Sequence, residues 1–86
     1  MVPDYVRTVL AEIRAQGGNA PAGFKPAERF HNREQQLPLS GEYGEYDVHP
    51  RVPGTSRGKE RLIIETMSGK AYYTPDHYRT FEPIEE

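Results

Sequence analysis

The 86-residue chain contains no cysteine, which excludes disulfides, thiolate metal sites and cysteine nucleophiles. It also lacks any run of about 18 apolar residues, so no segment is expected to span a membrane. Hydrophobic residues make up only 35% of the chain, in a count that leaves out glycine. A chain this short buries only roughly 60–65% of its unfolded surface. We therefore expect its function to lie on the surface or in a shallow cleft.

The chain also lacks an excess of positive charge, with a net charge of −2 and a pI near 5.9. A protein that coats nucleic acid without specificity would be basic, so this class is disfavoured. The basic residues are nevertheless concentrated between positions 49 and 61. That segment holds Arg51, Arg57, Lys59 and Arg61 against one acidic residue, Glu60. A local cationic strip in an acidic protein predicts a site for one or a few phosphates.

The N-terminal segment predicts one amphipathic helix over residues 4–16. Its apolar residues at helical spacing are Val6, Val9, Leu10 and Ile13. Pro3 and Asp4 suit the first turn, and Gly17-Gly18 provides a stop signal. A loop rich in Asn, Ala, Pro and Gly is expected to follow.

Short strand-like segments make up the rest of the chain. The first begins at Phe30 and ends at Leu37-Pro38, and the others cover residues 43–49, 60–66, 70–74 and 79–84. This order predicts an α+β fold, in which one N-terminal helix packs on a twisted antiparallel sheet of three to five strands. We expect residues 1–86 to form a single domain, with the sheet between about residues 28 and 84.

Period-2 alternation assigns side chains of the two middle strands to faces of the sheet. The residues expected to face the helix are Tyr46, Val48, Leu62 and Ile64. Glu45 and Arg61 would then point to the opposite face, which we expect to be exposed to water. Asp47 and His49 would share the face of Glu45.

Four polar motifs follow one another along the chain. They are Phe30-His31-Asn32-Arg33-Glu34 with Leu37-Pro38, Glu45-Tyr46-x-Val48, Arg57-Gly58-x-x-Arg61-x-Ile63, and Tyr72-Tyr73-Thr74-x-Asp76-His77-Tyr78-x-x-Phe81. In type, order and spacing they resemble the microbial guanyl-specific ribonucleases, the family that includes barnase. The resemblance covers roughly residues 4–84 and is strongest to the small acidic members from filamentous soil bacteria. It implies the microbial ribonuclease fold.

The resemblance implies that Glu45 is a general base, His77 a general acid, and Arg57 and Arg61 the phosphate-binding groups. In this route the 2′-hydroxyl of RNA attacks the adjacent phosphorus and leaves a 2′,3′-cyclic phosphate, which is then hydrolysed to a 3′-phosphate. Free Glu titrates near ~4.3 and free His near ~6.5, so between these values the base is ionised and the acid protonated. Because two arginines supply the positive charge, we expect neither metal nor cofactor.

Each of these residues also has an ordinary structural interpretation. Taken alone, Glu45 is a solvated carboxylate, Arg61 its cross-strand salt partner and His77 a turn histidine. The catalytic interpretation is favoured because all the required residue types occur together in the spacing that the chemistry needs.

A guanine-binding segment is the second implied site. Guanine offers two donors on one edge, N1–H and the N2 amine, which a single carboxylate accepts as a pair. Glu34 is the candidate carboxylate, and the backbone of Asn32 and Arg33 would donate to O6. Asn32 would hold this loop by local side-chain-to-backbone bonds. Phe30 and Tyr78 are the candidates for stacking on the base.

Some features depart from the family pattern. His31 stands where the relatives commonly have Gln or Ser, which would put a titratable group beside the guanine. The connection between Glu45 and Arg57 is slightly longer than in the relatives, and their N-terminal stretch with a disulfide is missing, so we expect a less stable protein. His31, His49 and His77 lack ligand-like spacing, so a metal site is not expected.

The resemblance implies a secreted monomer that cuts single-stranded RNA after guanosine and that a small acidic inhibitor of the barstar type would bind. The first ten residues show no basic segment followed by an apolar run, so no signal peptide is visible. Two other interpretations stay open. One is the toxin domain of a larger secreted effector, and the other is a catalytically inactive RNA-binding module on the same fold.

Overall fold

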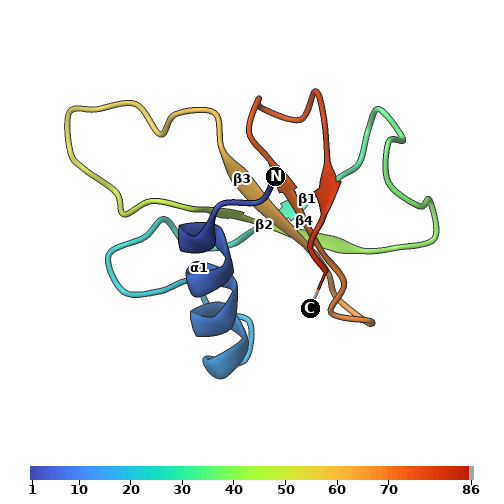
Figure 1. The fold of residues 1–86 in the computed structure, drawn as a ribbon, viewed down its shortest axis with the longest axis horizontal. Helices are drawn as coiled ribbons and strands as arrows, with labels where there is room; N and C mark the ends of the chain where they lie inside the picture. The colour runs from blue at the N-terminus through green and yellow to red at the C-terminus, as the bar shows by residue number, and fades with distance from the viewer. Residues whose placement is uncertain (86) are drawn as a thin grey trace.

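The computed structural model describes residues 1–85, which form one helix and one five-stranded antiparallel sheet (Figure 1). The elements are α1 (Asp4–Ala15), β1 (Glu28–Phe30), β2 (Tyr43–Asp47), β3 (Arg61–Glu65), β4 (Ala71–Thr74) and β5 (Glu82–Pro83). Each strand pairs with its neighbour in sequence, so the sheet order is β1-β2-β3-β4-β5. The expected α+β fold is confirmed.

Helix α1 forms where the apolar spacing predicts it. Asp4 lies in the first turn, where its carboxylate complements the positive end of the helix dipole. After Ala15 the chain turns through Gly17 and Gly18, whose φ angles of 67° and 98° cost glycine little. The Gly18 N–H donates to the carbonyl of Ile13 at 2.9 Å and so satisfies one of the last free carbonyls. The helix ends one residue before the predicted Gln16.

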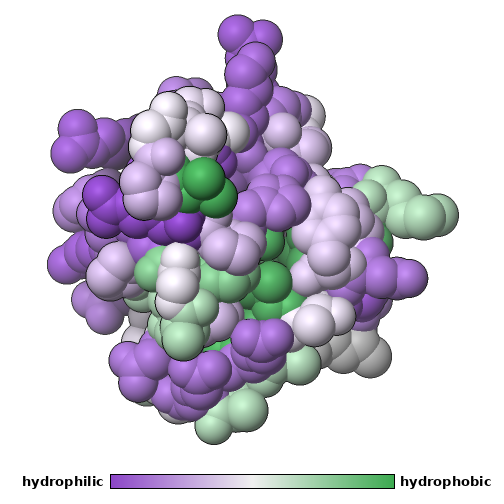
Figure 2. All heavy atoms as spheres, turned by 90° about the vertical axis from the view of Figure 1, so that its left-hand side faces the viewer, coloured by the Kyte–Doolittle hydropathy of each residue, from purple (hydrophilic) through white to green (hydrophobic). Residues whose placement is uncertain are grey.

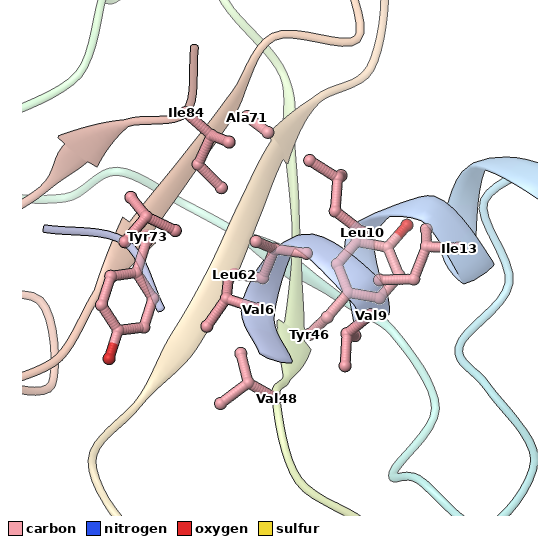
Figure 3. Close-up of a cluster of buried hydrophobic side chains, with 11 residues drawn as sticks. Val6, Val9, Leu10, Ile13, Tyr46, Val48, Leu62, Ala71, Tyr73 and Ile84 are labelled. Carbon is pink, nitrogen blue, oxygen red and sulfur yellow. The ribbon is translucent and has the colours of Figure 1, made fainter. Parts of the chain in front are cut away.

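The helix packs on one face of the sheet and forms the main core there (Figure 3). The buried members of this core are Val2, Val6, Val9, Leu10, Ile13, Tyr46, Val48, Leu62, Ala71, Tyr73 and Ile84. Ile64 packs against them while partly buried. The expected meeting of the helix with the middle strands is therefore confirmed, and each buried aliphatic side chain contributes about 1.5–3 kcal/mol.

The opposite face of the sheet is covered, so the expectation that it is exposed to water is wrong. A second apolar cluster lies on it, made of Leu37, Tyr43, Ile63 and Tyr72 with Phe30, Tyr78 and Phe81 packed against them. Most of the covering side chains come from the segments that join β1 to β2 and β4 to β5. As a result Arg61 is only 3% exposed. Alternation places this side chain on the correct face, but it cannot show that two loops fold over that face.

Two segments expected to be long strands are mostly loop. The first was expected to run from Phe30 to Pro38, but only Phe30 of it pairs in the sheet, as the last residue of β1. Asn32 and Gln35 adopt φ angles of 51° and 58°, which an extended strand cannot accommodate. The last strand shrinks to Glu82–Pro83, and the residues before it form a loop. These two loops carry most of the candidate site.

The long connection between β2 and β3 projects away from the sheet at the left of Figure 1. Residues 51–59 in it are all exposed. The molecule seen from that side is mostly hydrophilic, with hydrophobic side chains near the middle of the face (Figure 2). No helix within residues 1–85 is long and apolar enough to cross a membrane.

Candidate active site

Strand register brings the acidic and basic candidates to one end of the covered face. Asp47 of β2 lies directly opposite Arg61 of β3, and Arg61 lies opposite Thr74 of β4. Glu45 lies opposite Ile63 and so occupies the same face one step along the strand. The cross-strand partner of Arg61 is therefore Asp47, and the pairing with Glu45 considered from the sequence is wrong.

Asp47 joins the two candidate phosphate-binding arginines. Its carboxylate is buried, and the Arg57 guanidinium donates to it through Nε at 3.1 Å and Nη2 at 2.6 Å. This bond raises the pKa of Arg57 above its ordinary value. Nε of Arg61 lies 3.5 Å from the same carboxylate oxygen. Asp47 thus holds two guanidinium groups side by side, a role that the sequence analysis did not assign to it.

Arg61 is a buried cation whose hydrogen bonds are incomplete. Its Nη1 donates to the carbonyl oxygens of Gly58 at 3.2 Å and Glu60 at 2.7 Å. Its Nε has no hydrogen-bond partner among residues 1–85. The Asp47 carboxylate lies 3.5 Å from this nitrogen, so charge attraction rather than a close hydrogen bond compensates this buried donor.

The loop that carries His77 is fixed by side chains at its base. The buried Thr74 hydroxyl donates to Asp76 at 3.0 Å and accepts the N–H of Tyr78 at 2.9 Å. Asp76 in turn accepts the N–H and the hydroxyl of Thr80 at 2.9 and 2.7 Å. These bonds support positive φ angles of 56° at His77 and 75° at Tyr78. The His77 side chain is thereby held outward and exposed.

Tyr78 connects the candidate base, acid and stacking platform. Its hydroxyl donates to Oε2 of Glu45, and its ring stacks on Phe30 with centroids 5.2 Å apart. The His77 ring lies 4.6 Å from the Tyr78 ring. Burial, followed by the bond to Glu45, raises the pKa of Tyr78 to about 12. The phenol therefore stays protonated and keeps donating over the whole neutral range.

A shallow hollow of about 290 Å³ opens beside Glu45. It is lined by Arg29, Phe30, His31, Asn32, Arg33, Glu34, Gln36, Glu45, Tyr78 and Phe81, which include every residue expected to bind guanine. Asn32 closes the loop as expected, because it donates to the carbonyl of Leu37 at 2.9 Å and accepts the Leu37 N–H at 3.1 Å. Gln36 donates to the carbonyl of Tyr78 at 2.9 Å and ties this loop to the His77 loop.

His49 does not lie on the face of Glu45, and that expectation is wrong. Strand β2 ends at Asp47, so alternation no longer applies two residues later. The His49 ring packs 5.1 Å from the ring of Tyr5 of α1, and its Nε2 lies 2.7 Å from Oε2 of Glu60. Within residues 1–85 no group of three or more His, Asp or Glu side chains is placed to hold a metal ion.

Replacing Asp76 is expected to give a pH-dependent loss of stability. The Thr80 N–H, then the Thr80 hydroxyl, lowers the pKa of Asp76, so the folded state favours the carboxylate. This contribution is complete above the unfolded value of about 3.9 and is lost as the pH falls through the folded value. In urea denaturation, the free energy of unfolding of Asp76→Asn should therefore be lower than that of wild type at about pH 7, and this difference should disappear below about pH 4. A difference in the free energy of unfolding that stays constant across this pH range would contradict the stabilising role of the Asp76 carboxylate.

The comparisons with known proteins agree with this geometry. A family model described as ribonuclease matches residues 1–85. Guanyl-specific ribonuclease Sa from Kitasatospora aureofaciens is 43% identical over 60 residues, which cover 66% of this chain and 60% of that protein. Guanyl-specific ribonuclease Sa3 from the same organism is 41% identical over 59 residues, which cover 65% of this chain and 40% of that protein. The matched segments thus span less than two thirds of either relative's length.

Solved structures match the whole fold. Ribonuclease Sa2 with guanosine-2′-cyclophosphate superposes with a TM-score of 0.73 at 34% identity, covering 98% of this chain and 87% of that one. Ribonuclease Sa2 with 3′-GMP gives a TM-score of 0.73 at 32% identity, covering 98% and 88%. The resemblance seen in the four sequence motifs is confirmed, and the chain belongs to the ribonuclease family.

Proposed function

We propose that this protein is a metal-independent endoribonuclease that cuts single-stranded RNA on the 3′ side of guanosine. The observation that carries the proposal is the position of Glu45. It lines the hollow formed by the guanine-binding candidates, and it shares a sheet face with Asp47 and Arg61. Asp47 also binds Arg57, which comes from the connection between β2 and β3. A base bound in the hollow would therefore have its ribose beside a carboxylate and its 3′-phosphate beside two cations.

Guanine recognition would use the 30–34 segment. Glu34 accepts from N1–H and the N2 amine, and backbone N–H groups at Asn32 and Arg33 donate to O6. The aromatic surface of Phe30 and Tyr78 covers the base, and such stacking contributes about 1–3 kcal/mol per base. His31 lines the same hollow and adds a titratable ring beside the base.

Cleavage would proceed by acid–base catalysis. Glu45, oriented by the Tyr78 hydroxyl, takes the proton of the 2′-hydroxyl as this oxygen attacks phosphorus. Arg57 and Arg61 stabilise the charge that develops on the non-bridging oxygens, and His77 protonates the departing 5′-oxygen. In the second step Glu45 and His77 exchange their roles as base and acid, and water attacks the cyclic ester to give a 3′-phosphate.

A defined single-stranded RNA tests this function when it is incubated in the presence of EDTA and its termini are mapped. We expect cuts after G that leave 2′,3′-cyclic ends at a rate that chelation does not change. Glu34→Ala should lose about 10²-fold or more of its rate at G, because two bonds to a charged acceptor disappear, and should retain slow cleavage elsewhere. Glu12→Ala, which removes an exposed carboxylate of α1 that does not line the hollow, serves as the matched control. Cutting that stops under chelation, or wild-type cutting without preference for G, would contradict the proposal.

The same reasoning extends to organisation and partners. We propose that residues 1–86 form one ribonuclease domain that acts as a secreted monomer, and the family match over residues 1–85 supports the single domain. We also propose that a small acidic inhibitor of the barstar type binds this face. The Arg57 side chain, 38% exposed, supplies accessible positive charge for such a partner.

A further inference from the structure

Glu60 is the centre of a hydrogen-bond cluster that the proposed mechanism does not use. The hydroxyls of Tyr5 of α1 and Tyr73 of β4 both donate to its Oε1, the second at 2.6 Å. Its Oε2 lies 2.7 Å from Nε2 of His49. Burial works to raise the pKa of Glu60, but the bonds from Tyr5, Tyr73 and His49 outweigh it and lower that pKa. The side chain is therefore an ionised anchor point at neutral pH.

This anchor lies where the long connection between β2 and β3 returns to the sheet. Residues 51–59 are exposed, Glu60 is partly buried, and Arg61 is buried as the first residue of β3. The Tyr73 hydroxyl points out of the main core cluster (Figure 3). Glu60 thus fixes the end of an exposed segment to the helix side of the molecule.

The backbone beside this anchor holds the candidate catalytic groups. Three consecutive carbonyl oxygens, from Gly58 to Glu60, accept hydrogen bonds from them. Those of Gly58 and Glu60 accept from Nη1 of Arg61, and that of Lys59 accepts the N–H of His77 at 2.8 Å. A shift of this tripeptide would therefore move a phosphate-binding arginine and the loop of the candidate acid together.

We propose that Glu60 is a positioning residue for RNA cleavage. Its carboxylate, held by Tyr5, Tyr73 and His49, fixes the 58–60 backbone that orients Arg61 and His77. The inference rests on the proposed function, since it concerns groups that act there. A merely stabilising role would lower the free energy of unfolding and leave the folded protein's affinity for phosphate unchanged, so the two roles can be separated by experiment.

Glu60→Ala is the direct test, with binding and kinetics measured on protein shown to be folded by its denaturation curve. We expect about tenfold weaker binding of guanosine 3′-phosphate, because a charge-assisted contact of Arg61 is misaligned. Binding of guanosine, which lacks the phosphate, should stay unchanged. On a short RNA containing one G, kcat should fall by about 10–100-fold, as expected for a displacement of reacting groups. Glu60→Gln should restore most of both quantities, since its amide oxygen still accepts from the two tyrosines.

Glu65→Ala provides the matched control. Glu65 lies at the other end of β3 and accepts the N–H groups of Met67 and Ser68 at 2.9 and 3.1 Å, so its loss also removes local bonds of a carboxylate. Among residues 1–85 its side-chain bonds go to Met67 and Ser68, outside the candidate site, and its variant should bind guanosine 3′-phosphate like wild type. Equal losses in Glu65→Ala and Glu60→Ala would overturn the proposal.

The double variant Tyr5→Phe/Tyr73→Phe decides the question if Glu60→Ala does not fold. It removes the two hydroxyls that bind Glu60 and keeps both rings in place. It should therefore also weaken the binding of guanosine 3′-phosphate while leaving the binding of guanosine unchanged. A folded variant of either kind that binds guanosine 3′-phosphate as tightly as wild type would overturn the proposal. So would one whose affinity for guanosine falls as much as its affinity for guanosine 3′-phosphate. If the wild type cuts RNA but replacing Glu60 changes neither the binding of guanosine 3′-phosphate nor kcat, this inference alone fails. If the wild type does not cut RNA, the proposed function fails.

Discussion

Glu45→Gln and His77→Ala should each lower kcat for RNA cleavage by about 10²–10⁴-fold, the usual contribution of a positioned general base or acid. Glutamine has the shape of glutamate and still accepts the hydrogen bond of the Tyr78 hydroxyl, so the first variant should remain folded. His77 is exposed, its ring contacts only the neighbouring Tyr78 ring among the aromatic rings of residues 1–85, and its backbone N–H donates to the carbonyl of Lys59. Its removal should therefore also leave the structure intact. Initial rates on a short RNA containing one G, with urea curves for each variant, measure both effects.

The shape of the pH profile separates these roles from a general weakening of the site. A carboxylate base and an imidazolium acid give a bell-shaped dependence of kcat/KM on pH. Glu45→Gln should lose the acidic limb and His77→Ala the basic limb, while each keeps the other. A wild-type rate equal to that of the double variant would instead identify an inactive RNA-binding module on the same fold.

The main core was predictable from sequence because it depends on local periodicity. The 3.6-residue spacing of α1 and the alternation in β2 and β3 correctly name the side chains that meet between them. The second cluster was not predictable in this way. Leu37, Phe30 and Phe81 reach it from segments without regular alternation, and only tertiary packing brings them over Ile63. The sheet face predicted to be wet is therefore covered.

The candidate site was likewise predictable only where its residues lie in local sequence motifs. Residues that would touch RNA lie in contiguous motifs, and the hollow gathers the guanine-binding candidates as their sequence order suggests. The residues that hold them were missed, because they act across strands and loops. Asp47 could have been found from one signal, since it shares a strand face with Glu45 and lies opposite Arg61 once the register is known. Thr74 and Glu60 carry no such local signal, and their bonds appear only in three dimensions.

Asp47→Ala should be the most destabilising single change in the site. It leaves the guanidinium of Arg61, 3% exposed, without its carboxylate, and removing one partner of a buried ion pair costs about 3–5 kcal/mol. Asp47→Asn should lower the free energy of unfolding by less, because the amide oxygen still accepts a hydrogen bond from Arg57. Urea denaturation of the two variants beside wild type measures this order.

Added phosphate should recover part of that loss. With the carboxylate gone, an anion can take its place between Arg57 and Arg61, and a ligand that binds only the folded state stabilises it. The midpoint of unfolding should therefore rise more with inorganic phosphate in Asp47→Ala than in wild type, where Asp47 already offsets one of the two positive charges. Arg57→Ala in the Asp47→Ala background should abolish the extra gain, because the second cation of the site is then missing. A midpoint that phosphate raises in neither wild type nor Asp47→Ala would show that the two guanidinium groups do not act together on an anion, and the phosphate-binding role proposed for them would have to be abandoned.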